Sequence, residues 1–136
     1  MTEIRGQADP HVMVIEDDPA TATLLADLLS AEGYAVTVLD SALGARTAVE
    51  RQRPVAVLLD LGLPYRRGSA LLEELKADPR TAAIPVLIVS AYTEALPRHA
   101  AALAASIITK PFDTGLLLGA LDAACGGLAG PHPTTG

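Results

Sequence analysis

The 136-residue sequence has few of the residues that would give it a disulfide, a basic surface or an aromatic core. Cys125 is the one cysteine, so no internal disulfide can form. Basic residues number 10 against 16 acidic ones, a net charge of −6, whereas nucleic acids and anionic membranes are bound by clustered positive charge. We therefore expect no direct binding to nucleic acid and none to membrane.

Long apolar runs are also missing. Crossing a bilayer takes about 20 consecutive apolar residues, and no run approaches that length. Residues 1–10 carry acids and no apolar stretch, so they do not form a signal peptide. These features predict a cytoplasmic protein with an N-terminal extension at residues 1–10, one domain at residues 11–125, and a flexible tail, rich in glycine and proline, at residues 126–136.

Short apolar runs alternate with segments of helical periodicity. Runs of this length are typical of strands buried on both faces, and they occupy residues 12–15, 35–39, 55–59, 86–89 and 106–109. Asp18, Ser41 and Asp113 are predicted to cap helices between these runs. Residues 91–105, interrupted by Pro97, predict at most a short helix. The alternation predicts an α/β doubly wound fold with a parallel sheet and helices on both faces.

Polar residues follow the predicted strands at their carboxyl ends, where parallel α/β sheets bind ligands. They are Glu16, Asp17 and Asp18, then Asp60, Ser90, Thr109 and Lys110. Two or three aspartates with open coordination positions suit Mg²⁺, which prefers a few carboxylates together with water and phosphoryl oxygens. Asp17, Asp18 and Asp60 carry about three negative charges, which a divalent ion and the Lys110 ammonium would balance. An incoming anion then fits only if Asp60 is neutralised on reacting, as a covalent nucleophile that attacks phosphorus would be.

Four blocks resemble the signatures of response regulator receiver domains of two-component signalling. They are VIEDDP, VLLDLGLP followed by Gly68, VLIVSA and ITKPF, and the resemblance covers about residues 11–125. It implies a flavodoxin-like five-stranded sheet of order 2-1-3-4-5. It also implies a phosphorylation switch that catalyses only its own aspartyl phosphorylation and slow dephosphorylation. The implied partners are a sensor histidine kinase or histidine phosphotransfer protein and an unknown downstream protein.

The resemblance also implies a role for each acidic residue. Asp60 would accept the phosphoryl group. Asp18 and Asp60 would ligate Mg²⁺ directly, the backbone carbonyl of Gly62 would be a third ligand, and Asp17 would act through water. Positioning and charge neutralisation of this kind are most of what phosphoryl transfer requires.

Ser90 and Lys110 would bind phosphoryl oxygens, and the bond before Pro111 would be cis. The family usually has an aromatic residue three positions before the lysine, where this sequence has Ile107. Because isoleucine cannot make the same aromatic swing, we expect the output face to signal differently or weakly. That face comprises the fourth helix, the fifth strand and the fifth helix.

Two further residues bear on the lifetime of the phosphoryl group. Tyr92 is bulky enough to overhang the phosphoryl group and Gly62 has no side chain to guide water, so slow dephosphorylation is expected.

Some of the residues named above also have simpler interpretations. In these simpler interpretations Asp18, which precedes a proline, is just a helix cap, Glu16 is just a solvated neighbour, and Cys125 is just an apolar filler.

Alternative functions remain open at this point. A haloacid-dehalogenase-type Mg²⁺-dependent phosphatase also uses an aspartate nucleophile at a strand end, but it needs a second aspartate where Gly62 stands. A degenerate receiver would act by protein binding alone. A flavodoxin-like nucleotide-binding domain would need a phosphate loop after the first strand, where the acids would repel phosphate. The receiver itself could be a single-domain response regulator or a phosphorelay shuttle.

Overall fold

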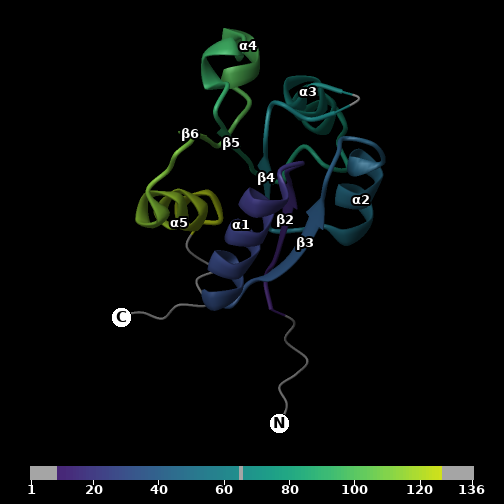
Figure 1. Cartoon of the computed structure of the whole chain (residues 1–136). Helices are drawn as coiled ribbons and strands as arrows, with labels where there is room; N and C mark the ends of the chain where they lie inside the picture. The colour runs from purple at the N-terminus through teal and green to yellow at the C-terminus, as the bar shows by residue number, and fades with distance from the viewer. Residues whose placement is uncertain (1–8, 65, 127–136) are drawn as a thin grey trace.

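The computed structural model describes residues 9–64 and 66–126, so nearly all of the expected N-terminal extension and tail lie outside the described residues. Five parallel strands form one sheet in the order β3-β2-β4-β5-β6 (Figure 1). They are β2 (His11–Ile15), β3 (Ala35–Leu39), β4 (Ala56–Leu59), β5 (Val86–Ser90) and β6 (Ser106–Thr109). Counted along the chain this is order 2-1-3-4-5, which confirms the expected doubly wound fold.

Helices cover both faces of the sheet. They are α1 (Pro19–Ala31), α2 (Ala45–Gln52), α3 (Gly68–Ala77), α4 (Arg98–Ala101) and α5 (Thr114–Ala124). Successive strand residues point to opposite faces, so Met13 and Ile15 pack with α2 and α3 whereas Val12 and Val14 pack with α1 and α5. Two apolar layers, one on each side of the sheet, therefore hold the strand ends in place.

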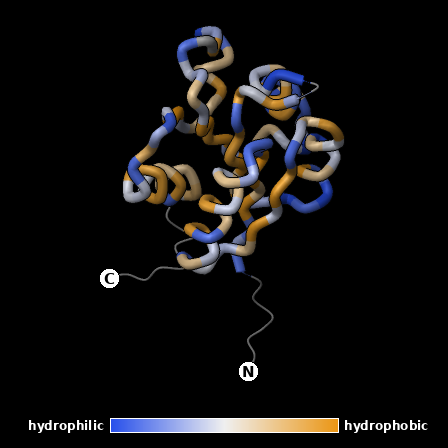
Figure 2. The backbone as a smooth tube through the Cα atoms, viewed as in Figure 1, coloured by the Kyte–Doolittle hydropathy of each residue, from blue (hydrophilic) through white to orange (hydrophobic). Residues whose placement is uncertain are grey.

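The core is aliphatic, as the scarcity of aromatic residues predicts. Its largest fully buried side chains are all leucine, isoleucine or methionine, and the central strands are largely hydrophobic (Figure 2). Cys125 packs in the layer with α1 and α5, where burial raises the pKa of its thiol. Within residues 9–64 and 66–126, no helix combines the length and the apolar character needed to cross a membrane.

Two of the three predicted helix caps are confirmed. Asp18 and Asp113 each accept a hydrogen bond from the backbone N–H three residues on, at the starts of α1 and α5. The prediction for Ser41 is wrong, because α2 begins only after Gly44, whose φ of 70° is left-handed. The Ser41 hydroxyl instead accepts the N–H of Leu43 in the preceding turn.

The segment between β5 and β6 is short of regular helix, as its sequence predicts. It contains a 3₁₀ turn, η1 (Thr93–Ala95), and the four-residue helix α4, with Pro97 between them. Tyr92, two residues beyond the end of β5, is 62% exposed in this segment. It forms one border of the polar edge described next.

Candidate functional site

Three carboxylates meet beyond the ends of the two central strands. β2 and β4 are neighbours with Ile15 paired to Leu59, so the residues that follow them, Glu16 and Asp60, lie side by side. Glu16, Asp17 and Asp60 each place one carboxylate oxygen within 4.8 Å of the others. Glu16 and Asp60 are buried, and Asp17 is exposed, so the group is open to solvent on one side.

Glu16 is not the solvated neighbour that the sequence suggested. Its side chain is 2% exposed, and its backbone N–H extends the β2–β3 hydrogen bonding by donating to the Leu39 carbonyl at 2.9 Å. Lys110 Nζ donates to Glu16 Oε1 at 2.6 Å. Burial raises the pKa of Glu16, and the hydrogen bond from Lys110 opposes that rise. The hydrogen bonding to β3 therefore continues one residue beyond the end of β2, and this places Glu16 in the site.

Asp18 occupies a different place from the one expected. Its carboxylate is exposed and caps α1, accepting from the backbone N–H of Thr21 at 3.0 Å and from the Thr21 hydroxyl at 2.6 Å. These bonds lower the pKa of Asp18. The structure does not bring it into the carboxylate group, where Glu16 stands beside Asp17 instead. Pro19 starts the helix, so the preceding side chain is used as the cap.

Ser90 and Lys110 lie on the other side of Asp60, as the sequence predicts. Ser90 is completely buried at the end of β5, and its hydroxyl accepts the N–H of Tyr92 at 3.1 Å. Lys110 donates its backbone N–H to the Ser90 carbonyl, and its Nζ lies 3.7 Å from Asp60 Oδ2. The peptide bond between Lys110 and Pro111 is cis, which confirms the expectation. One ammonium group thus lies between two buried carboxylates.

The loop after Asp60 is held by close backbone packing. A Cβ at Gly68 would come within 2.2 Å of the Asp60 carbonyl oxygen, so the start of α3 can approach this loop only with glycine there. Tyr92 covers the loop from above, because a Cβ at Gly62 would lie 3.0 Å from its ring. The backbone N–H of Gly62 faces Asp60 Oδ1 at 3.4 Å. The backbone at Gly68 and the Tyr92 ring therefore leave little free space around Asp60 and the loop that follows it.

The balance of charge at this edge favours a cation. Glu16, Asp17 and Asp60 against Lys110 leave a formal charge of −2 when all four are ionised. The donors are all carboxylate oxygens, the ligands preferred by hard divalent ions such as Mg²⁺, and Asp17 leaves one side open. The residues present therefore fit such an ion.

Comparison with known proteins identifies the family. The family model of the response regulator receiver domain matches residues 12–122, so the chain belongs to the receiver domain family of two-component systems. Members of this family are signalling switches controlled by phosphorylation rather than enzymes of metabolism.

The relatives differ in how much of their length this chain spans. It is 36% identical over 112 residues to the DNA-binding dual master transcriptional regulator RpaA of Synechocystis sp., covering 80% of this chain but only 46% of that protein. It is 30% identical over 127 residues to protein Rrf1 of Nitratidesulfovibrio vulgaris, covering 92% of this chain and 89% of Rrf1.

One similar solved structure contains a metal ion. The receiver domain of the sensor histidine kinase PA1611 from Pseudomonas aeruginosa, with magnesium coordinated in its active-site cleft, superposes with a TM-score of 0.79. It is 26% identical, and the match covers 88% of this chain and 99% of that one.

Proposed function

We propose that this chain is a phosphorylation-controlled switch in which Asp60 accepts a phosphoryl group from a phosphohistidine. The observation that carries the proposal is the position of Asp60, which is 6% exposed, lies beside the carboxylates of Glu16 and Asp17, and is 3.7 Å from Lys110 Nζ. A carboxylate oxygen of Asp60 would form a bond to phosphorus as the P–N bond breaks. The imidazole nitrogen keeps that electron pair and takes a proton. The donor would be a sensor histidine kinase or a histidine phosphotransfer protein.

We assign Asp17 and Asp60 as direct Mg²⁺ ligands. Both Glu16 oxygens already accept hydrogen bonds, from Lys110 Nζ and from the Asp18 N–H, so Glu16 would act through water. The backbone carbonyl of Gly62 completes the proposed set, as the family resemblance implies. When bound, the ion would neutralise charge around the incoming phosphoryl group. Asp18 has no part in this set, because its Oδ2 caps the start of α1 and its carboxylate does not belong to the group formed by Glu16, Asp17 and Asp60.

Ser90 and Lys110 would hold the phosphoryl oxygens after transfer. The Ser90 oxygen already accepts the N–H of Tyr92, so its own hydroxyl hydrogen is free to donate to a phosphoryl oxygen. The Lys110 ammonium is shared between Glu16 and Asp60 and can turn toward a third acceptor with a short side-chain movement. Both groups stabilise charge that arrives only with phosphorylation.

We further propose that Tyr92 slows hydrolysis of the aspartyl phosphate. Its ring lies against Gly62, so it narrows the approach of water to Asp60. The variant Tyr92→Ala should shorten the half-life of the phosphorylated protein, measured by loss of the phosphoryl mass over time. An unchanged half-life would remove this role from Tyr92.

The wider setting is a cytoplasmic two-component pathway, with residues 11–125 as the receiver domain. A single-domain regulator or phosphorelay shuttle is supported by the near full-length match to Rrf1. The downstream partner would be a protein. Ile107 is 41% exposed on the edge strand β6, where the family's aromatic switch residue would stand, so output through this face would not use an aromatic swing.

Intact mass after incubation with acetyl phosphate and Mg²⁺ tests the proposal. We expect a metal-dependent gain of one phosphoryl group that is lost in Asp60→Asn and kept in Asp18→Asn. No gain with any donor, in a protein that still binds Mg²⁺, would indicate a degenerate receiver that acts by binding alone. A gain that persists in Asp60→Asn would overturn the assignment of the acceptor.

A further inference from the structure

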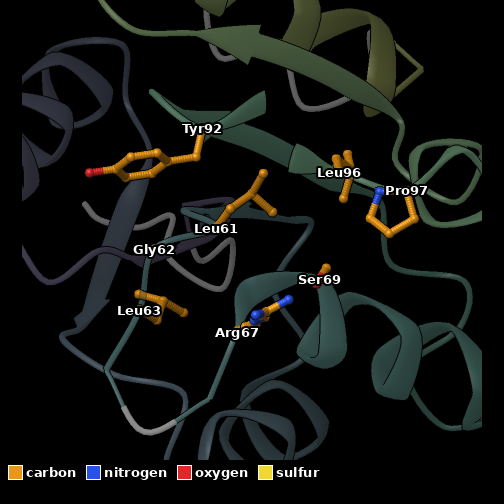
Figure 3. Close-up of a pocket in the computed structure, with 8 residues that line it drawn as sticks. All are labelled: Leu61, Gly62, Leu63, Arg67, Ser69, Tyr92, Leu96 and Pro97. Carbon is orange, nitrogen blue, oxygen red and sulfur yellow. The ribbon is translucent and has the colours of Figure 1, made fainter. Parts of the chain in front are cut away.

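A groove of about 510 Å³ opens beside the loop that follows Asp60 (Figure 3). Its apolar walls are Leu61, Leu63, Tyr92, Leu96 and Pro97. Leu61 and Leu63 form a buried floor, whereas Tyr92 and Pro97 are exposed at the rim. The groove therefore presents apolar surface that a solvent-exposed segment of another molecule can reach.

One end of the groove is positively charged. Arg67 and Ser69, at the start of α3, line that end. Arg66 is paired with Glu74. The Arg67 backbone carbonyl accepts the N–H groups of Ala70 and Leu71, but its guanidinium has no hydrogen bond or ion pair with any residue in the described part of the chain. As the residue before α3, Arg67 also supplies no side-chain cap, and the first turn of α3 has no acid. The Arg67 guanidinium and the positive end of the α3 dipole therefore lie together, with no acidic side chain in the first turn of α3 to balance them.

We propose that this groove binds a short extended segment of a partner protein in which a carboxylate stands next to a bulky apolar side chain. The carboxylate would pair with Arg67, and the apolar side chain would lie between Tyr92 and Leu96. One arginine matches one carboxylate. A ligand rich in phosphate would instead meet the buried charge of Asp60 nearby, in a chain whose net charge is −6.

The two walls of the groove are attached to the phosphorylation site. Leu61 and Gly62 directly follow Asp60, and Tyr92 donates its N–H to the Ser90 hydroxyl. A segment bound here would contact the residues that move if Asp60 or Ser90 changes partner. Affinity and phosphorylation would then alter one another reciprocally. This consequence rests on the proposed function, but the binding itself does not.

The test uses the full unphosphorylated chain, so it is independent of chemistry at Asp60. The probes are fluorescein-labelled octapeptides of glycine and serine with a central Phe-Asp or Asp-Phe pair, and matched peptides carrying Asn for Asp or Ala for Phe. Fluorescence anisotropy should show binding with a Kd below about 1 mM for at least one Phe/Asp order. The Asn and Ala peptides should bind roughly fivefold more weakly or worse, because each lacks one of the two contacts.

Protein variants locate the site. Arg67→Gln should weaken the acidic peptide to the level of its Asn counterpart, whereas Arg66→Gln, whose arginine is already paired, should leave its affinity unchanged. Amide shifts on titration should centre on Leu61 and Ser69. The proposal is overturned if neither Phe/Asp order binds, if Arg66→Gln and Arg67→Gln lower affinity equally, or if the shifts centre on α1.

Discussion

Two groups of charged residues in this molecule differ in their balance of acidic and basic side chains. The acidic edge consists of Glu16, Asp17, Asp60 and Lys110 at the strand ends. The outer ion-pair cluster joins α2 to α3 and the turn after it, and consists of Arg46, Arg66, Arg80, Glu50, Glu74 and Asp78. The first has three acids to one base, whereas in the second every charge has a partner and the formal charges cancel.

Burial deepens this contrast. Glu16 and Asp60 side chains are 2% and 7% exposed, whereas members of the outer cluster range from 16% to 60%. Uncompensated charge that is also buried costs stability, so a fold retains it where it serves binding or chemistry. Balanced charge at the surface contributes little and only joins elements. Burial without matching charge therefore marks the acidic edge as the candidate functional group, whereas the outer ion-pair cluster is structural.

The largest expected effect concerns packing at the acidic edge. Gly68→Ala should destabilise the protein by about 3 kcal/mol, because the added methyl would meet the Asp60 carbonyl at 2.2 Å and backbone cannot turn aside. Urea unfolding measures the change. Gly119→Ala is the control: no atom lies within 4 Å of its added Cβ, and it should stabilise α5 by about 0.5 to 1 kcal/mol. Equal changes in the free energy of unfolding for the two variants would mean that the backbone around Asp60 can move to accommodate the added methyl group.

The next prediction distinguishes neighbouring aspartates. Asp17→Asn should lower Mg²⁺ affinity by roughly 10- to 100-fold, since Asp17 belongs to the carboxylate group. Asp18→Asn should change it by less than about twofold, because Asp18 caps α1. Isothermal titration calorimetry of both variants checks this. A larger loss in Asp18→Asn would restore the ligand assignment made from the sequence.

Asp17 and Asp18 also show which features of the fold and the site can be predicted from the sequence. Alternating apolar runs predicted all five strands to within a residue, and the strand order followed from the family blocks. The sequence also predicted that Asp60, Ser90 and Lys110 lie at strand ends, because each directly follows or ends an apolar run. Where these predictions succeeded, a single periodicity or motif determined the position.

Glu16 and Asp18 could not be assigned in the same way. Three consecutive acids leave open which of them stays beside the sheet, and only the hydrogen bond from the Glu16 N–H to the Leu39 carbonyl shows that Glu16 does so, directly beyond the end of β2. Pro19 was the available signal, since it commits the preceding residue to capping. The cap prediction for Ser41 was wrong for a similar reason, because the sequence does not show how many turn residues precede α2. The pairing of Lys110 with Glu16 spans 94 residues and has no local signature.

A third prediction compares the two groups directly. Lys110→Met should destabilise the protein by about 1 to 3 kcal/mol at neutral pH, because it removes the cationic donor of the buried Glu16 carboxylate and leaves only the Asp18 N–H on its other oxygen. The deficit should shrink at acidic pH, because burial raises the pKa of Glu16 and its protonated form does not need the lost ammonium. Urea unfolding at neutral and at acidic pH measures it.

The matched change in the outer cluster is Arg46→Met. Arg46 contacts Glu50, Glu74 and Asp78 while 26% exposed, so its loss should cost about 1 kcal/mol or less and the cost should fall further in high salt. If Arg46→Met proved more damaging than Lys110→Met, burial would not be what separates the two groups.

The smallest effect is a pH dependence within the outer cluster. Hydrogen bonds from Arg80 lower the pKa of Asp78 from 3.8 to about 2. A carboxyl with a lowered folded pKa stabilises the fold above its unfolded pKa, and the stabilisation is lost as pH falls through the folded value. Wild type and Asp78→Asn should therefore differ in urea midpoint above pH 3.8 and converge toward pH 2. A difference that persisted at pH 2 would mean that Asp78 acts by its shape as the residue ending α3, and not by its charge.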